Sequence, residues 1–232
     1  MTAAHCIEGK ATNLRIVFSN ELMNTVNARE VDIQQNFVRH GVAQIIHPEY
    51  SDAINEKKDV DWHDIALIKF SGTVPEGYKP ATFLTDEASL VKGALVTLAG
   101  YGVTQVTTDE IDVKKHKNID SEIESGDIVC DDEIAKTHCY AISFDGDDEL
   151  YETKAPLEGT SDLEVRLDES EHGTCVGDSG GPAYIEKDGA YYLFGITSRG
   201  SLACDGSGVY TNAVKFKSWI EDSTKKLNGE SI

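Results

Sequence analysis

Short runs of β-branched and apolar residues, each ended by polar turn residues, recur along this 232-residue chain. Runs of this length and composition are typical of β-strands. Only the last part, residues 212–227, has helical spacing with a broad apolar face. Many short strands and one terminal helix predict an all-β barrel or sandwich. The predicted strands are 14–18, 42–46, 65–70, 94–101, 190–197 and 208–211, and the apolar helix positions are Val214, Trp219, Ile220 and Leu227.

Charge limits the classes of partner. The chain has 41 acidic and 21 basic side chains and a formal net charge of −20. A surface of this sign repels nucleic acid and anionic membranes, so neither is an expected partner. No stretch approaches the roughly 18 apolar residues of a membrane-spanning helix, and none is predicted. No charged-then-apolar leader is visible, so no signal peptide is predicted within these residues.

One segment, residues 145–171, differs from the rest in composition. It has eleven acidic and two basic side chains, close to half of the net charge. The simplest interpretation is a solvated, self-repelling surface insertion. A calcium-binding loop and an exosite for basic substrates are the alternatives, although D-G-D-D-E at 145–149 lacks the full spacing of a calcium loop.

The chain has five cysteines, an odd number. An odd number implies a free thiol, an intermolecular disulfide or a missing partner. A metal site is not predicted, because no C-x-x-C pair occurs and no histidine has zinc-finger spacing to a cysteine pair. No cofactor is predicted either. The cysteines are Cys6, Cys130, Cys139, Cys175 and Cys204.

The sharpest local motif is G-D-S-G-G-P, residues 177–182. Serine needs a base to act as a nucleophile. The surrounding glycines allow a tight backbone that points amides at one spot, and the amides of Gly177 and Ser179 could form an oxyanion hole. A Gly-rich turn with an ordinary serine is the alternative. The full hexapeptide favours Ser179 as a nucleophile.

A base and an orienting acid must accompany such a serine. His5 lies in T-A-A-H-C, where small residues could pack behind an imidazole, and no other histidine has so specific a setting. Asp64 begins the apolar run I-A-L-I-K-F, where a carboxylate can be buried and aimed at an imidazole. Asp59 and Asp61 lie in a polar run and are expected to be solvated. The competing histidines are His40, His47, His63, His116, His138 and His172.

The three motifs T-A-A-H-C, D-I-A-L-I and G-D-S-G-G-P, in the order His, Asp, Ser, strongly resemble the trypsin/chymotrypsin family of serine endopeptidases. The resemblance covers most of the chain, because other family motifs follow in order. These are H-P-E-Y (47–50), G-Y-G (100–102, where the family usually has G-W-G), S-R-G (198–200), G-V-Y-T (208–211) and the terminal S-W-I helix.

The resemblance implies two packed antiparallel β-barrels of chymotrypsin type and a C-terminal helix. Residues 1–88 would form an incomplete first barrel, residues 89–211 the second barrel with the acidic insertion, and residues 212–232 the helix and tail. His5, Asp64 and Ser179 would form the catalytic triad, and Ser198 would brace Asp64. The expected partners are peptide or protein substrates, and the expected state is a monomer.

The resemblance also implies the cysteine pairing. Cys175 would bond Cys204 across the primary specificity pocket, and Cys130 would bond Cys139. Cys6 would bond a cysteine upstream of the histidine, so it is expected to be unpaired here. Disulfides place a protein in an oxidising compartment, and an extracellular location is therefore expected.

The specificity pocket is expected from the same family pattern. Trypsin-like members have an aspartate six residues before the serine, whereas this chain has Gly173 there. Gly200 and Gly208 would form the walls and leave the pocket open and neutral. These positions predict cleavage after apolar or aromatic residues, although Asp205 could still lend negative charge nearby. Arg199 stands where the family usually has Trp.

Activation in this family frees an N-terminal ammonium that inserts beside the aspartate preceding the serine, here Asp178. No activation segment occurs in these 232 residues, so Met1 is interpreted as an internal methionine or the edge of a fragment. Asp178 is expected to stay solvated, with a misordered oxyanion loop and an inactive chain. A longer form, cut by an activating protease, would be the competent enzyme.

Two other function classes are compatible with a serine nucleophile motif. A catalytically silent homologue that acts as a binding module is the alternative, although the intact His5, Asp64 and Ser179 favour the enzyme. An α/β-hydrolase is excluded by motif order, because there the serine comes first and the histidine last.

Overall fold

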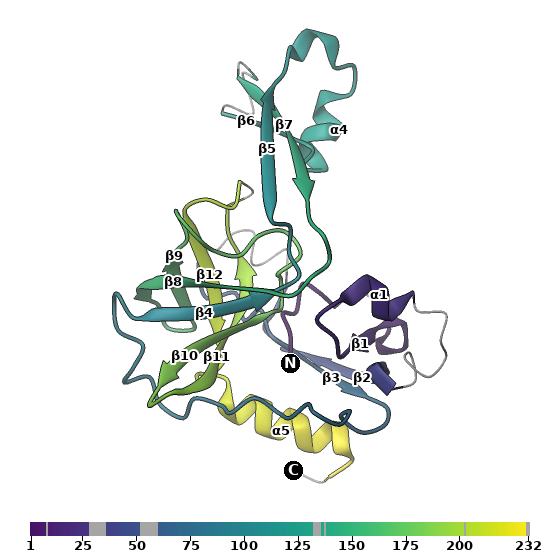
Figure 1. The fold of residues 1–232 in the computed structure, drawn as a ribbon, viewed down its shortest axis with the longest axis vertical. Helices are drawn as coiled ribbons and strands as arrows, with labels where there is room; N and C mark the ends of the chain where they lie inside the picture. The colour runs from purple at the N-terminus through teal and green to yellow at the C-terminus, as the bar shows by residue number, and fades with distance from the viewer. Residues whose placement is uncertain are drawn as a thin grey trace. The chain divides into compact units, whose positions relative to one another are not determined.

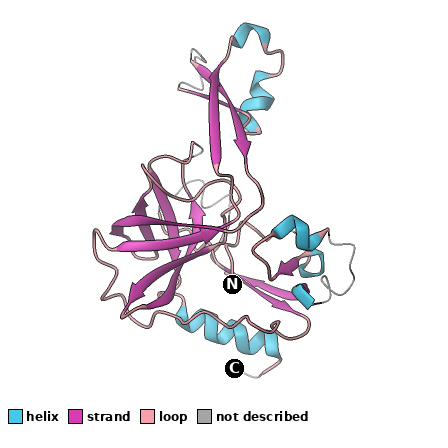
Figure 2. Cartoon of the chain, in the orientation of Figure 1, coloured by secondary structure: helices cyan, strands magenta, loops and turns pink. Residues whose placement is uncertain are grey.

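The computed structural model describes residues 1–7, 9–27, 36–51, 60–131, 136, 138–201 and 203–230 (Figures 1 and 2). The chain divides into two compact units. The first comprises Met1–Gly102 with Asp148–Ile232, and the second is Val103–Asp147. The described part is mostly β-structure, as the sequence predicted. The boundary expected near residue 88 stays a prediction.

A closed barrel of six antiparallel strands dominates the first unit (Figure 1). Its strand order is β10-β11-β12-β9-β8-β4. Alternate side chains of each strand point inward, and the largest of them, including Phe194 and Tyr210, are fully buried. The strands are β4 (Leu95–Gly100), β8 (Tyr151–Thr160), β9 (Glu164–Asp168), β10 (Pro182–Lys187), β11 (Ala190–Arg199) and β12 (Ser207–Asn212).

The prediction of a surface insertion at 145–171 was wrong for most of that segment. Its residues form β8 and β9, two of the six barrel strands. Charged side chains alternate with buried apolar ones, as in β9, where Val165 and Leu167 are buried and Arg166 and Asp168 are exposed. Most of the acidic residues of 145–171 thus lie outside these two strands, and two of the acidic residues, Glu164 and Glu169, are buried.

A three-stranded sheet, in the order β1-β2-β3, holds the N-terminal part of the first unit. The predicted strands at 14–18, 42–46 and 65–70 all appear in it. Short helical segments precede and follow β1. The elements are η1 (Ala11–Asn13), β1 (Arg15–Val17), α1 (Leu22–Val26), β2 (Val38–Ile46) and β3 (Ala66–Phe70).

Helix α5 (Lys217–Asn228) ends the described chain and stops at Gly229, which has a positive φ of 77°. The sequence predicted a helix from residue 212, but Asn212 belongs to β12 and a turn follows it. Phe216, Trp219 and Ile220 pack in a cluster with Ala3 and Ile65. No helix in the described ranges is long and apolar enough to cross a membrane.

The second unit, Val103–Asp147, is a small sheet in the order β5-β7-β6 with a short helix. Its core holds the Cys130–Cys139 disulfide, whose two residues face each other in the β6–β7 register. The unit is inserted between β4 and β8, which pair directly with each other. Its elements are β5 (Gln105–Glu110), η2 (Val113–Lys115), α4 (Ile119–Glu124), β6 (Ile128–Cys130) and β7 (Cys139–Asp145).

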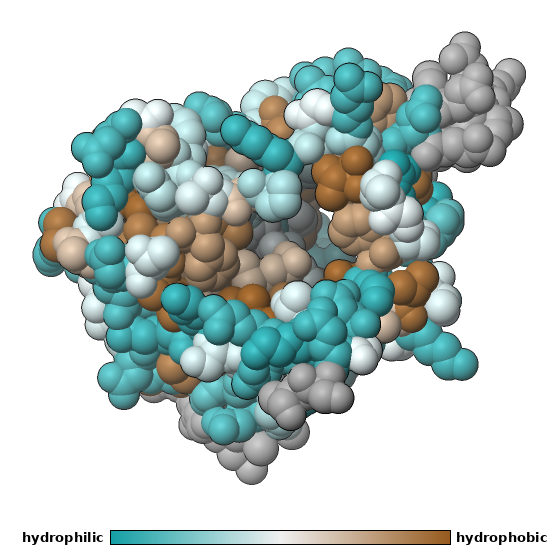
Figure 3. All heavy atoms as spheres, turned by 90° about the horizontal axis from the view of Figure 1, so that it is seen from below, coloured by the Kyte–Doolittle hydropathy of each residue, from teal (hydrophilic) through white to brown (hydrophobic). Residues whose placement is uncertain are grey.

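Polar and charged side chains predominate on the face shown in Figure 3, with smaller apolar patches between them. Within the described ranges, no group of three or more His, Cys, Asp or Glu side chains is arranged to hold a metal ion.

Candidate active site

His5 and Asp64 meet because the start of the chain pairs with β3. The backbone of Thr2 exchanges two hydrogen bonds with Ala66, at N···O distances of 3.0 and 2.8 Å. The buried Ala3 and Ala4 then lead into His5. Its Nδ1 lies 2.7 Å from Oδ2 of Asp64, and its backbone N–H donates to Oδ1 at 3.0 Å. Two contacts therefore fix the imidazole on one carboxylate.

Residues of β11 and β12 also hold Asp64. The hydroxyl of Ser198 donates to Oδ2 of Asp64 at 2.6 Å, and Thr211 donates to the backbone carbonyl of Asp64 at 2.9 Å. The Asp64 side chain is 1% exposed. Ser198 and Asp64 are 134 residues apart in sequence, so the barrel fold brings this bracing hydroxyl to the acid.

These contacts shift both pKa values. Burial opposes ionisation of Asp64, but the hydrogen bonds from His5 and Ser198 outweigh burial and lower the pKa of Asp64. The hydrogen bond to Asp64 is the main cause that raises the pKa of His5 above its usual 6.5. Asp64 therefore stabilises the imidazolium that forms whenever His5 takes up a proton.

Ser179 lies exposed in the turn before β10. Gly177 has a φ of 100°, which L-residues rarely adopt, and Gly180 leaves room for the segment of His5. A Cβ on Gly180 would lie 2.1 Å from Oγ1 of Thr2 and 3.3 Å from Sγ of Cys6. Among the described residues no hydrogen bond joins Ser179 to His5. The segments that carry these two residues pack against each other at Gly180.

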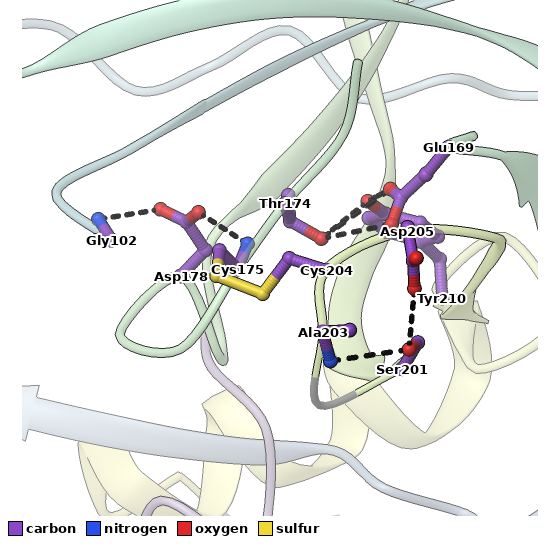
Figure 4. The surroundings of a disulfide bond; sticks show 10 residues. All are labelled: Gly102, Glu169, Thr174, Cys175, Asp178, Ser201, Ala203, Cys204, Asp205 and Tyr210. Atoms are coloured by element: carbon purple, nitrogen blue, oxygen red, sulfur yellow. Dashed lines mark hydrogen bonds between the residues drawn. A yellow bond between two sulfur atoms is a disulfide. The ribbon is translucent and has the colours of Figure 1, made fainter. Parts of the chain in front are cut away.

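The prediction that Asp178 stays solvated was wrong. Its half-buried carboxylate accepts hydrogen bonds from the amides of Gly102, at 2.8 Å, and Cys175, at 2.9 Å (Figure 4). Backbone N–H groups can donate hydrogen bonds to a carboxylate, as the N–H groups of a cationic side chain do. The loop before Ser179 is therefore anchored through Asp178.

The disulfide Cys175–Cys204 links the loop before Ser179 to the loop before β12 (Figure 4). Both pairs implied by the resemblance, this one and Cys130–Cys139, are present. Cys6 has a free thiol.

The expectation of an open, neutral pocket at Gly173 and Gly208 does not agree with the structure. A Cβ on either glycine would collide with the side chain of Glu169, at 2.3 Å in both cases. Glu169 was not predicted from the sequence, although the alternation of buried and exposed residues in β9 could have indicated that it is buried. Val165 and Leu167 point into the barrel, and the next position of that period is 169.

Arg199, which stands where the resemblance expects Trp, pairs with the buried Glu164. Nη1 and Nη2 donate to Oε1 and Oε2 of Glu164 at 2.8 and 2.9 Å. The guanidinium carbon also lies 4.3 Å from the ring centroid of Trp62, whose backbone N–H donates to Glu164. Arg199 directly follows Ser198, so this ion pair borders the residue that braces Asp64.

The sequence model of the trypsin family matches residues 1–220. Kallikrein 1-related peptidase b27 of Mus musculus is 29% identical over 238 residues, which cover 97% of this chain and 76% of the relative. Atrial natriuretic peptide-converting enzyme of Homo sapiens is 28% identical over 229 residues, covering 95% of this chain but 18% of that protein. CLIP domain-containing serine protease B4 of Anopheles gambiae is 43% identical over 53 residues, 22% of this chain and 15% of the relative.

Proposed function

The chain belongs to the trypsin family of serine endopeptidases, and we propose that it hydrolyses peptide bonds through His5, Asp64 and Ser179. The observation that carries the proposal is the bonded set of His5, Asp64 and Ser198, with Asp64 buried beneath the imidazole. A histidine held in this way has one ring N–H donated to the acid, and its other nitrogen is left to accept a proton.

The proposed reaction has two steps. The hydroxyl oxygen of Ser179 attacks the scissile carbonyl carbon while Nε2 of His5 takes the hydroxyl proton. The amides of Gly177 and Ser179 donate to the negative oxygen of the tetrahedral intermediate. His5 then gives its proton to the leaving amine, which departs and leaves an acyl-enzyme. Water, deprotonated by His5, then attacks the carbonyl carbon of the ester, the bond from that carbon to the oxygen of Ser179 breaks, and His5 returns the proton to this oxygen.

Labelling of Ser179 tests the proposal. A fluorophosphonate should attach to this serine in the complete, activated protein, and mass spectrometry of the digest should find the adduct on the peptide that contains G-D-S-G-G-P. Ser179→Ala should abolish the adduct, whereas Ser170→Ala, at an exposed serine, should keep it. A complete protein that takes no label would instead be the catalytically silent binding module.

The raised pKa of His5 leads to a pH prediction. His5 must be neutral to accept the proton of Ser179, so kcat/KM should rise with pH as the imidazolium deprotonates. Because the hydrogen bond to Asp64 raises the pKa of His5, the midpoint of the acid limb should lie above 6.5. A profile of kcat/KM from about pH 5 to pH 10 measures it. A midpoint at or below 6.5 would contradict the stabilised imidazolium.

The proposal extends to an extracellular enzyme. Two disulfides within one chain support an oxidising compartment. Recovery of the protein from the culture medium of its source cells, rather than from the lysate, is the check. An activating peptidase, and an ammonium that reaches Asp178, stay predictions of the family resemblance.

A further inference from the structure

The side chain of Glu169 occupies the space between Gly173 and Gly208. A Cβ built on Gly173 would lie 2.3 Å from Cβ of Glu169, and one on Gly208 would lie 2.3 Å from its Oε2. Glycine at both positions is therefore what makes room for this carboxylate. Glu169 is 5% exposed.

The barrel fixes this position from the backbone. Strand β9 ends at Asp168, which pairs with Ser207 at the start of β12. One residue on, the N–H of Glu169 donates to the carbonyl of Gly206 at 2.6 Å. The inward alternation of β9 thus continues past its end, and it turns Glu169 toward the interior end of the barrel.

Hydroxyl groups surround the carboxylate. Tyr210, itself fully buried, donates a hydrogen bond to Oε1, and Oγ1 of Thr174 lies 3.3 and 3.5 Å from the two carboxylate oxygens (Figure 4). Among the described residues no Lys, Arg or His forms an ion pair with Glu169. Burial raises the pKa of Glu169, and the bonds from Tyr210 and Thr174 oppose that shift.

A buried carboxylate without a cation is costly to keep. Glu164, in the same barrel, illustrates the usual solution, since it is buried beside Arg199. Glu169 has hydrogen-bond donors but no counterion among the described residues. A bound cation could therefore pair with this carboxylate without displacing any counterion from the described part of the chain.

Glu169 adjoins the residues proposed to bind substrate. Thr174, which faces its carboxylate, precedes Ser179 by five residues in the same loop. A Cβ on Gly200 would lie 3.8 Å from the Cα of Gly208, and Gly200 follows Ser198 by two residues. A continuous path of neighbours thus leads from Asp64, through Ser198 and the two glycines, to the carboxylate.

We propose that Glu169 is the specificity-determining residue of this peptidase and that its carboxylate binds the side chain of an arginine or lysine that supplies the scissile carbonyl. The inference rests on the proposed function and replaces the expectation of apolar or aromatic cleavage. The carboxylate of Glu169, whose side chain lies against Gly173, would have the role that an aspartate at position 173 has in trypsin-like members.

Paired peptide substrates test the inference. The four peptides are identical except for Arg, Lys, Phe or Ala before the scissile bond. In the complete, activated protein, kcat/KM for the Arg or Lys peptide should exceed that for the Phe and Ala peptides by about 100-fold or more. Glu169→Gln should remove at least about 100-fold of that preference, mainly by slowing cleavage of the basic peptides. Gln keeps an acceptor for Tyr210, so the variant should fold.

Glu171→Gln is the matched control. Glu171 is exposed and lies two residues after Glu169. Its change to Gln also removes one negative charge, but it should leave the preference for basic peptides unchanged. Equal or faster cleavage of the Phe peptide by the unaltered protein would overturn the inference. Preference for Ala would do so too, since it would mean that Glu169 fills the pocket.

A binding measurement separates this inference from the proposed function. The fluorescent arylamidine p-aminobenzamidine has a planar cation that fits a carboxylate, and its binding requires no turnover. It should bind the unaltered protein and Ser179→Ala, and binding to Glu169→Gln should weaken by about 100-fold. If no peptide is cleaved and Ser179 takes no label, the proposed function fails. The amidine titration then decides alone, and equal binding to Glu169→Gln would refute the role of Glu169.

Discussion

Asp64→Asn should lower kcat by about 10,000-fold and leave the fold intact, the size of effect known for the same change in a serine peptidase triad. Asp64 accepts hydrogen bonds from the side chain and backbone of His5 and from Ser198. An asparagine amide can present an N–H to Nδ1 of His5 in place of an acceptor. The ring proton then moves to Nε2, and the imidazole can no longer take the proton of Ser179.

The measurement is kcat on a good peptide substrate at the pH optimum, with circular dichroism to confirm the fold. Ser198→Ala is the comparison, because it removes one hydrogen bond from the same carboxylate but keeps its charge. That variant should lose no more than about tenfold, in line with roughly 1 kcal/mol for one hydrogen bond. A loss of less than about 100-fold for Asp64→Asn would show that another residue orients the base.

Arg199→Met should lower the free energy of unfolding by about 3–5 kcal/mol. Glu164 is 2% exposed, and Arg199 supplies two of the N–H donors to its carboxylate. Methionine fills much of the volume of arginine but leaves the carboxylate buried without a cation. The cost therefore arises mainly from the charge that remains.

Urea unfolding of the variant and the unaltered protein measures the difference. Adding Glu164→Gln to Arg199→Met should recover a large part of the lost stability, because the uncompensated charge is then removed. Arg166→Met, at an exposed position of the neighbouring β9, should change stability by about 0.5 kcal/mol or less. Equal losses for Arg166 and Arg199 would argue against a special role for the buried pair.

Local pattern was sufficient to predict the strands with strong apolar character. The runs at 65–70 and 190–197 appear as β3 and β11, because a continuous apolar strand has few alternatives to burial. Strands β8 and β9 were missed because charged residues of both signs on the strands, and the acidic residues around them, obscured the alternation of buried Ala155, Leu157 and Val165.

In the candidate active site, local motifs likewise could not predict contacts between residues that are far apart in sequence. Motifs near His5, Asp64 and Ser179 indicated the chemistry, and the structure brings His5 onto Asp64. One of the two partners of Asp178, Gly102, lies 76 residues away in sequence. The location of Glu169 depends on the register between β9 and β12 and on two glycines elsewhere. No local pattern encodes such contacts.

The direct pairing of β4 with β8 affects which part of this chain can change in sequence and length. Gly100 faces Tyr151 in that pair, so the ends of the 103–147 unit are fixed at the spacing of neighbouring strands. In thermodynamic terms the unit is a hairpin loop, and the entropy of closing a loop grows only slowly with its length. Residues 103–147 can therefore diverge, lengthen or be exchanged in evolution while the barrel that carries Ser179 stays the same.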